Sequence, residues 1–319
     1  MRITIVVPVY GRSELLGKAL ASVLALEESQ WRLLIADDGS DAATQRFLED
    51  WLAQHGSKQV EWRRRPHNLG LFANLNLAIR EATTEWVLLL CSDDLLLPSA
   101  ITRLGQLRQE WPEAGLILST FHSINADGSS RPADSAWYHN QVSRNTALIP
   151  PERFVPALLQ LGSLNGNLTG MGFSRTLWQQ ARPFRDDWRH AADWEWLLRA
   201  AELGPLLMNR EPIAKVRTHA AQLSNSNRRS GHELQEVAEV VRQLRHHPLL
   251  ATEPRRHAWA AHRMQFQLWN LLKQWRGLEA GERRAKLRAI KTSAGLSRST
   301  LALIRSAPTR LRGFLNLAE

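Results

Sequence analysis

The feature that most constrains the fold is an alternation of short apolar runs and helix-spaced stretches in the first third of the chain. Apolar runs predict strands at 3–8, 31–36, 60–64 and 86–90. Amphipathic stretches between them predict helices at 15–24, 44–52 and 71–82. Strands that alternate with helices form parallel sheets covered by helices. The sequence therefore predicts an α/β fold with a doubly wound, mostly parallel sheet flanked by helices.

The rest of the chain shows fewer strand signals. We expect one more strand at 114–120 and a loop-rich region at 126–151. Helices are expected at 151–161, 176–181 and 193–203. Beyond residue 230 the apolar spacing is helical throughout, with candidate helices at 232–244, 253–276 and 281–294. The sequence thus predicts a helical C-terminal extension after the α/β region.

Polar residues follow three of the predicted strands: Tyr10 the first, Asp37 and Asp38 the second, and Asp93 and Asp94 the fourth. Ligands of doubly wound sheets bind outside the carboxyl ends of the strands. Paired carboxylates repel each other unless a cation or hydrogen-bond donors offset their charge, and oxygen ligands suit Mg²⁺ or Mn²⁺ shared with substrate phosphates. The pattern indicates a metal site for a diphosphate substrate. The alternatives are that Asp93 or Asp94 caps the next helix and that residues 37–40 form an ordinary turn.

Several other classes of protein are excluded or disfavoured. The sequence has neither a G-x-G-x-x-G after the first strand nor a G-x-x-x-x-G-K-[ST], so no dinucleotide fingerprint or P-loop handles the phosphate. Cys91 is the single cysteine, which excludes an internal disulfide and fits a reducing compartment. No run approaches the ~18 apolar residues of a membrane span, and the apolar start is too short for a signal peptide. We expect a cytoplasmic protein, either soluble or peripheral on the inner face of the cell membrane.

The positive charge is confined to the C-terminal part. Residues 1–227 hold 23 Lys and Arg against 24 Asp and Glu, whereas residues 228–319 hold 18 against 7. Such a segment attracts anionic partners or forms a solvated helical face. Residues 293–319 alternate leucines with arginines, which predicts a helix that binds an anionic membrane surface, and the alternatives are packing on the core or pairing with another copy. Nucleic acid is not an expected partner, because no RNP, KH or helix-turn-helix signature is present.

The motifs, taken in order, resemble those of the family 2 glycosyltransferases, which have the GT-A fold. The matching segments are Val7–Arg12, Asp37–Ser40, Asn68–Gly70 with Asn76, Ser92–Asp94 with Pro98, Pro183–Asp186, Asp193–Arg199, and His219 with Gln222–Ser224. The resemblance implies a GT-A domain over 1–227, with a nucleotide-sugar half at 1–105 and an acceptor half at 106–227, followed by the basic helical extension at 228–319.

The resemblance also implies a nucleotide-diphosphate sugar as donor, with a UDP sugar as the first expectation. The residues expected to bind the donor are Pro8, Val9, Tyr10, Asp37, Asp38, Asn68, Gly70 and Asp93. Asp93, Asp94 and His219 are expected to hold Mn²⁺ or Mg²⁺. Cys91 stands where the family's D-x-D motif has its first acid, and Leu75 stands where an Arg is common before Asn76.

Asp193 falls on the aspartate that is similar to the family's general base. The resemblance implies that the sugar is transferred with inversion to a hydroxyl of a glycan or lipid-linked acceptor. Such transfer would belong to surface polysaccharide biosynthesis. Ala192 replaces the acid that usually precedes this base, and the alternative for Asp193 is a helix N-cap. The residues expected on the acceptor side are Gly170, Trp194 and Glu195, together with Gly166 and Thr169. Four aromatic residues there could stack on sugar rings, but packing is the favoured role of each: Trp137, Tyr138, Trp188 and Trp194.

Two other functions stay open on the sequence alone. A catalytically silent glycan-binding or scaffold protein would retain the fold and explain Cys91 and Ala192. A sugar-phosphate nucleotidyltransferase would share the metal and the nucleotide cleft, but it should begin with a Gly-rich loop followed by Arg and Lys, where this chain has only Gly11 and Arg12.

Overall fold

The structure is a computed structural model that describes residues 2–132, 139–165, 167–219 and 232–315, with side chains of the last segment described over 233–306. The chain divides into two compact units. The first comprises Met1–Phe154 and Ser163–Gln222, and the second comprises Val155–Gly162 and Leu223–Glu319.

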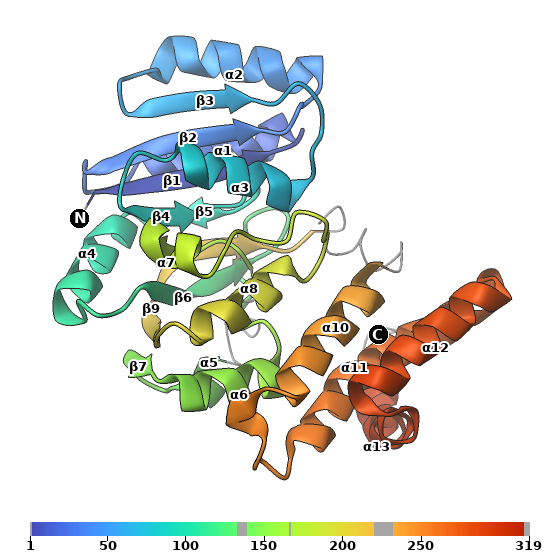
Figure 1. Ribbon diagram of the computed structural model, residues 1–319. Helices are drawn as coiled ribbons and strands as arrows, with labels where there is room; N and C mark the ends of the chain where they lie inside the picture. Colours follow the sequence, from blue (N-terminus) through green and yellow to red (C-terminus); the bar gives the residue numbers. More distant parts are fainter. Residues whose placement is uncertain (1, 133–138, 166, 220–231, 316–319) are drawn as a thin grey trace. The chain divides into compact units, whose positions relative to one another are not determined.

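The first unit is built on one nine-stranded sheet with the order β3-β2-β1-β4-β8-β6-β9-β5, and β7 pairs with β9. Its first half consists of the parallel strands β1 (Ile3–Val9), β2 (Trp31–Asp37), β3 (Val60–Arg64) and β4 (Trp86–Leu89). They alternate with α1 (Ser13–Leu24), α2 (Ala42–His55) and α3 (Leu71–Glu81), and Figure 1 shows α3 in front of these strands. The strands and helices expected in this half, and the mostly parallel sheet, are confirmed.

Apolar periodicity explains these elements. Strand β1 is a β-branched run whose residues are nearly all buried, because helices cover both faces of a parallel sheet. Helix α1 buries Leu16, Ala19, Leu20 and Val23, which lie three or four residues apart on one face. Leu16, Leu20 and Val23 join one hydrophobic cluster with Leu48 of α2 and apolar residues of β1 and β2.

The second half of the sheet was only partly predicted. It contains β5 (Leu95–Leu96), β6 (Leu116–Ile124), β7 (Ala147–Ile149), β8 (Met171–Ser174) and β9 (Leu206–Arg217), with helices α4 (Ala100–Glu110), α5 (His139–Val142), α6 (Pro151–Leu161), α7 (Arg175–Gln180) and α8 (Ala192–Ala201). Strand β8 is antiparallel to both β4 and β6, and β9 is parallel to β6. The sequence predicted β6 and missed β9, because charged residues and Pro212 interrupt the strand pattern where its register shifts beside Ser119 and Phe121.

The turn after β2 needs its glycine. Gly39 has φ = 73°, and a Cβ atom at this position would lie 2.7 Å from the carbonyl carbon of His67 and 3.0 Å from the amide nitrogen of Asn68. The turn at the end of β2 therefore lies directly against the loop that leads into α3, and this close approach brings together two segments at the carboxyl ends of the strands.

The second unit is helical, as the sequence predicted. It contains α10 (His232–Arg245), η2 (Pro248–Leu250), α11 (Arg256–Gln274), η3 (Trp275–Gly277), α12 (Ala280–Ala294) and α13 (Leu296–Leu315). Helix α11 packs against α10, α12 and α13, and its buried residues include Met264, Leu268 and Leu271. None of the helices in the described residues combines the length and apolarity needed to cross a membrane.

Candidate active site

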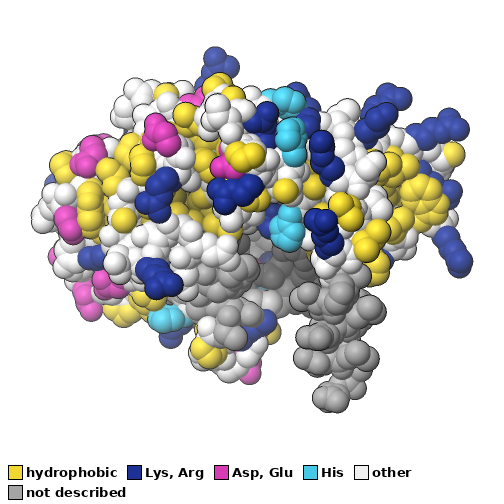
Figure 2. All heavy atoms as spheres, turned by 90° about the horizontal axis from the view of Figure 1, so that it is seen from below, with side chains coloured by type: hydrophobic (Ala, Val, Ile, Leu, Met, Phe, Trp, Pro, Cys, Tyr) yellow, Lys and Arg dark blue, Asp and Glu magenta, His cyan; other side chains and the backbone are white. Residues whose placement is uncertain are grey.

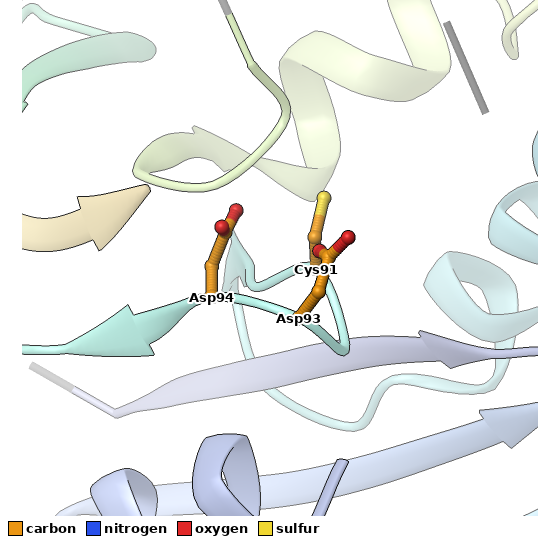
Figure 3. A group of neighbouring side chains, drawn as sticks. All are labelled: Cys91, Asp93 and Asp94. Atoms are coloured by element: carbon orange, nitrogen blue, oxygen red, sulfur yellow. The ribbon is translucent and has the colours of Figure 1, made fainter. Parts of the chain in front are cut away.

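The loop between β4 and β5 gathers the site's acidic residues. Figure 3 shows Cys91, Asp93 and Asp94 on this loop with their side chains directed to the same side. One potential ligand atom from each of the three lies within 4.8 Å of the others. The loop follows the carboxyl end of β4, which is the edge of the sheet where the sequence predicted the site.

Asp94 is completely buried and is hydrogen-bonded through both oxygens. Its Oδ1 accepts the backbone N–H of Arg217 at 2.7 Å, and its Oδ2 accepts the Thr169 hydroxyl at 2.5 Å and the Asn167 amide at 3.0 Å. Burial raises the pKa of Asp94 above its ordinary value, and the neighbouring Asp93 charge adds to this effect. The residue joins the β4–β5 loop to the end of β9 and to the segment before β8.

Asp93 has a different environment, with one oxygen open. Its Oδ2 lies 2.9 Å from Nε2 of His219 and 3.3 Å from Nη1 of Arg12, while Oδ1 has no hydrogen bond to any described residue. A carboxylate oxygen beside an imidazole nitrogen suits Mn²⁺ as a ligand set. A divalent cation at Asp93 would also offset the charge that raises the pKa of Asp94. The residues present therefore fit a metal, with Asp93 and His219 as ligands and Asp94 as the support of their loop.

Cys91, in the place of an acid, takes part in the same network. Burial raises the pKa of its thiol well above the ordinary value, so the sulfur is protonated at neutral pH. The S–H donates to Oδ1 of Asn167 at 3.2 Å, and the Cys91 backbone N–H donates to the Thr169 hydroxyl at 2.9 Å. Cys91 thus contributes a neutral hydrogen bond where an acid would add a third negative charge.

Arg12 is a site residue that the sequence analysis did not single out. It has φ = 64° and follows Gly11 with φ = 69°, and the left-handed conformation costs a residue with a Cβ roughly 1 kcal/mol or more. The Gly11 N–H donates to the Ser40 hydroxyl at 3.1 Å, which fixes this turn. The strained backbone carries the Arg12 guanidinium to Asp93.

The two acids after β2 play different parts. Asp38 accepts the N–H groups of Leu69 at 2.8 Å and Gly70 at 2.9 Å, so it holds the loop before α3, and burial raises its pKa. Asp37 is fully buried, and its Oδ1 accepts the Ser40 N–H at 2.9 Å. Its Oδ2 has no hydrogen-bond partner among the described residues and lies 3.9 Å from Nε of Arg64.

The remaining residues expected at the donor site lie on the same edge of the sheet. Tyr10 is 61% exposed, Asn68 is exposed and Pro8 is half-buried. Val9 is buried, and its carbonyl accepts the Asp38 N–H at 2.9 Å. Gly70, with φ = 94°, precedes the first turn of α3. Tyr10 and Asn68 thus present side chains to solvent, whereas Val9 and Gly70 act through their backbone.

Asp193 lies in the first turn of α8, two residues after the N-cap Ala191, so it is not the cap that the sequence offered as an alternative. Its carboxylate accepts the Asn165 amide at 2.8 Å and the Ser163 hydroxyl at 3.3 Å. Burial raises the pKa of Asp193, and the Asn165 hydrogen bond opposes this shift. The geometry gives a partly buried carboxylate with an elevated pKa, held by two side chains of one loop.

The segment that contains these two side chains connects Asp193 to the buried Asp94. Ser163 and Asn165 bind Asp193, and Asn167 and Thr169 bind Asp94, so polar side chains two residues apart divide between the two carboxylates. The following Gly170 has φ = 86°, and its N–H donates to the carbonyl of Leu89 in β4 at 3.1 Å. In the sequence, the signal for this segment is four alternating polar residues after a helix, and their partners cannot be predicted from that pattern.

The other residues expected on the acceptor side are placed in the protein interior. Trp194 is 6% exposed, and Glu195 is buried with both carboxylate oxygens bound by Arg199 at 2.9 and 2.7 Å. Arg199 also donates to the carbonyls of Arg182 and Pro183, so this pair fixes the turn before α8. Trp194 is thus packed in the interior, the role that the sequence favoured for the aromatic residues, and Glu195 holds a turn. Trp137, Tyr138, Gly166 and residues 222–224 lie outside the described residues.

The comparisons with known proteins agree with the motifs and the fold. The family model described as "Glycosyl transferase family 2" matches residues 4–164. The chain therefore belongs to this family of sugar-transferring enzymes, and the family predicted from the motifs is confirmed.

Similar structures share the fold over nearly the whole chain. The crystal structure of S. aureus TarS 1–349 superimposes with a TM-score of 0.66 at 13% identity, covering 98% of this chain and 92% of that one. A mannosyltransferase from Pyrobaculum calidifontis, PcManGT, gives 0.56 at 15% identity, covering 95% and 87%. At these identities the likeness concerns the fold, which is of the GT-A type.

Similar curated sequences match over shorter stretches. An uncharacterized protein of Sinorhizobium fredii, y4gI, is 29% identical over 63% of this chain and 20% of its own length. The putative glycosyltransferase EpsE of Bacillus subtilis is 24% identical over 32% of this chain and 36% of its own length. The matches thus span a fifth to about a third of these relatives.

Thr169 provides a test of the Asp94 network. In Thr169→Val, the carboxylate loses its hydroxyl donor and the Cys91 N–H loses its acceptor, so we expect the free energy of unfolding to fall by about 2–4 kcal/mol. Thr169→Ser retains the hydroxyl and should stay within about 1 kcal/mol of wild type. Urea denaturation measures both values. Equal stability of the Val and Ser variants would contradict the assigned network.

Proposed function

We propose that the protein transfers a sugar from a nucleotide-diphosphate donor to a hydroxyl of a glycan or lipid-linked acceptor, in the synthesis of a surface polysaccharide. The observation that carries the proposal is the open oxygen of Asp93 beside His219, next to Asp94. Asp94 accepts hydrogen bonds from Asn167 and Thr169, and Ser163 and Asn165 of the same segment bind the carboxylate of Asp193. This arrangement offers a metal site and a base on one edge of the sheet.

Asp37 and Tyr10 support a nucleotide donor. A buried carboxylate oxygen without a hydrogen bond is costly, and an N–H group of a nucleotide base at Oδ2 of Asp37 would satisfy it. The exposed ring of Tyr10 lies at the end of the neighbouring strand and offers a face for stacking. Structures of TarS with UDP and with UDP-GlcNAc, and of PcManGT with GDP-Man and Mn²⁺, give precedent for such donors on this fold. We propose a UDP sugar as the first candidate.

Asp93 and His219 would hold the metal, which is Mn²⁺ or Mg²⁺. When bound, the metal would offset the negative charge on the departing diphosphate. Asp94 holds the loop that carries Asp93, and Arg12 adds a guanidinium beside the same carboxylate. The chain thus provides both a metal site and an organic cation for the diphosphate.

Asp193 would act as the general base. A carboxylate within hydrogen-bond reach of the acceptor hydroxyl takes its proton as the oxygen attacks the sugar carbon, and the diphosphate leaves from the opposite face. This single displacement inverts the configuration at that carbon. Asn165 and Ser163 orient the carboxylate through their hydrogen bonds.

The donor and metal are tested by thermal melting with a panel of nucleotide diphosphates and nucleotide sugars, each with and without Mn²⁺. We expect one nucleotide to raise the melting temperature in a metal-dependent way, because ligand at ~100 times its Kd adds about 2.7 kcal/mol. Asp93→Asn should lose the metal-dependent part, and Asp50→Asn, an exposed residue of α2, should retain it. A flat panel at millimolar ligand would instead favour a catalytically silent scaffold.

The base is tested by Asp193→Asn. We expect turnover to fall about 10²- to 10⁴-fold, since proton transfer by a positioned base contributes that much, while the metal-dependent thermal shift with donor persists. Turnover within about tenfold of wild type would overturn the assignment.

The pH profile gives a second readout of the same base. Asp193 acts in its charged form, so activity is lost as pH falls through its raised pKa, at a higher pH than for an ordinary aspartate. Asn165→Leu removes a donor that lowers this pKa, so the acid limb should move to higher pH. Ser163→Ala removes the longer bond and should move it less. An unchanged acid limb in Asn165→Leu would show that another group titrates.

We further propose that the C-terminal helices bind an anionic membrane surface near a lipid-linked acceptor. Figure 2 shows Lys and Arg side chains beside hydrophobic ones at the right of the view, where α12 and α13 lie. Leu301 and Ile304 of α13 are 47% and 63% exposed, and Leu272 of α11 is 48% exposed. Exposed apolar side chains within a strongly basic segment suit an anionic lipid interface.

Vesicle sedimentation tests this surface. We expect the full chain to pellet with anionic vesicles and not with neutral ones, because basic residues each contribute about 1 kcal/mol near an anionic surface. Replacing Leu301 and Ile304 together by Gln should reduce the pelleted fraction, and both side chains are exposed, so the fold should persist. Equal sedimentation with neutral vesicles, or none with either, would reject the proposal.

A further inference from the structure

A second cleft lies at the opposite edge of the same sheet. It has a volume of about 820 Å³ and is formed where β1, β2 and β4 begin, together with one side of α4. Ile3 pairs in register with both Trp31 and Trp86, so the three strands start at the same level. Figure 1 shows the amino end of the chain and α4 at the left. Since β2 has seven residues, about 20 Å of strand separates this cleft from the site at the carboxyl edge.

The lining of the cleft is positively charged. Four cationic side chains, Arg2, Arg32, Lys58 and Arg108, line it with one acid, Glu85. Among the described residues, the structure records a carboxylate within ion-pairing distance of only one of the four cations, Glu61 at 3.8 Å from Arg32. The side chains of Arg2 and Lys58 have no recorded hydrogen bond or ion pair in this part of the chain. Such an excess of unpaired cations attracts an anion.

The floor of the cleft is rigid and aromatic. Trp31 and Trp86 are 9% and 2% exposed, and both belong to the hydrophobic core. The Arg108 guanidinium lies 5.5 Å from the centre of the Trp86 ring, which orients this cation over an aromatic face. The rim is polar, with Ser29, Gln30, Thr83 and Gln109 as hydrogen-bonding side chains.

Gly105, in the middle of α4, supports a ligand site in this cleft independently of the charges. Glycine inside a helix costs about 1 kcal/mol relative to alanine, so its presence usually has a reason. A Cβ atom at Gly105 would meet no other atom within 4 Å, and packing within the protein therefore does not require the glycine. Gly105 lines the cleft, and a side chain there would extend into space that a ligand could use.

We propose that this cleft binds a small phosphorylated molecule with at least two negative charges. Arginine side chains bind phosphate through paired N–H donors, and the volume lies in the range of small-molecule sites, roughly 300–1,000 Å³. The hydroxyl and amide groups of the rim suit the hydroxyl groups of such a molecule. The site is separate from the proposed transfer reaction, and its existence does not depend on that reaction.

The test compares two variants that differ by one charge. Gly105→Glu and Gly105→Gln place side chains of the same size in the cleft, and both are good helix formers, so both should melt at or above the wild-type temperature. Calorimetric titration with inorganic pyrophosphate, in EDTA to exclude metal-dependent binding at Asp93, should show affinity at least tenfold weaker for Gly105→Glu than for Gly105→Gln. Lys58→Ala should weaken binding as well.

Two results would overturn the proposal. One is equal pyrophosphate affinity of the Glu and Gln variants. The other is no detectable binding of pyrophosphate to the wild type up to about 10 mM, because a Kd above this concentration is far weaker than that of a specific site. Parallel titrations with glucose 6-phosphate and with a nucleoside diphosphate identify the source of the phosphate. Tighter binding of glucose 6-phosphate would identify the ligand as a sugar phosphate. Tighter binding of the nucleoside diphosphate, if Gly105→Glu abolishes it, would identify the ligand as a nucleotide.

Discussion

The buried carboxylate of Asp94 is the interaction on which the site depends. It accepts hydrogen bonds from Arg217, Thr169 and Asn167, which lie 73 to 123 residues away in the chain. A buried charge is tolerated only when donors surround it, so the three segments must meet wherever Asp94 is enclosed. The end of β9, the segment before β8 and the loop after β4 are therefore fixed relative to one another by one residue.

Hydrogen bonds at the ends of strands also hold other site residues in place. Asp38 binds two N–H groups before α3, and the close approach at Gly39 leaves no room for a side chain between these loops. Arg12 occupies a left-handed conformation that brings its charge to Asp93. Strain and buried charge are thus concentrated at the carboxyl edge of the sheet, as expected where a rigid scaffold carries a reactive site.

The two edges of the sheet differ in their acidic residues. Acidic side chains follow the strands at their carboxyl ends, whereas cationic side chains surround the strand starts at Arg2, Arg32 and Lys58. The parallel pairing of β1, β2 and β4 produces this separation, because it places all the strand starts on one side and all the strand ends on the other. The proposed metal site and the proposed anion site therefore lie at opposite ends of the same strands.

The sequence by itself determined the strand–helix alternation of the first half, the helical C-terminal region, and the acids at strand ends, because apolar periodicity and chain order are local properties. It also identified the family. Only the tertiary structure decided that Asp93, and not Asp94, keeps an open oxygen, that Glu195 is bound by Arg199, and that β9 pairs with β5, β6 and β7. These contacts join residues that are far apart in the chain, and they depend on which side chains the fold buries. The residues of a single strand cannot determine either. The cleft at the strand starts has the same origin, since three strands and a helix must assemble before its cations face one space.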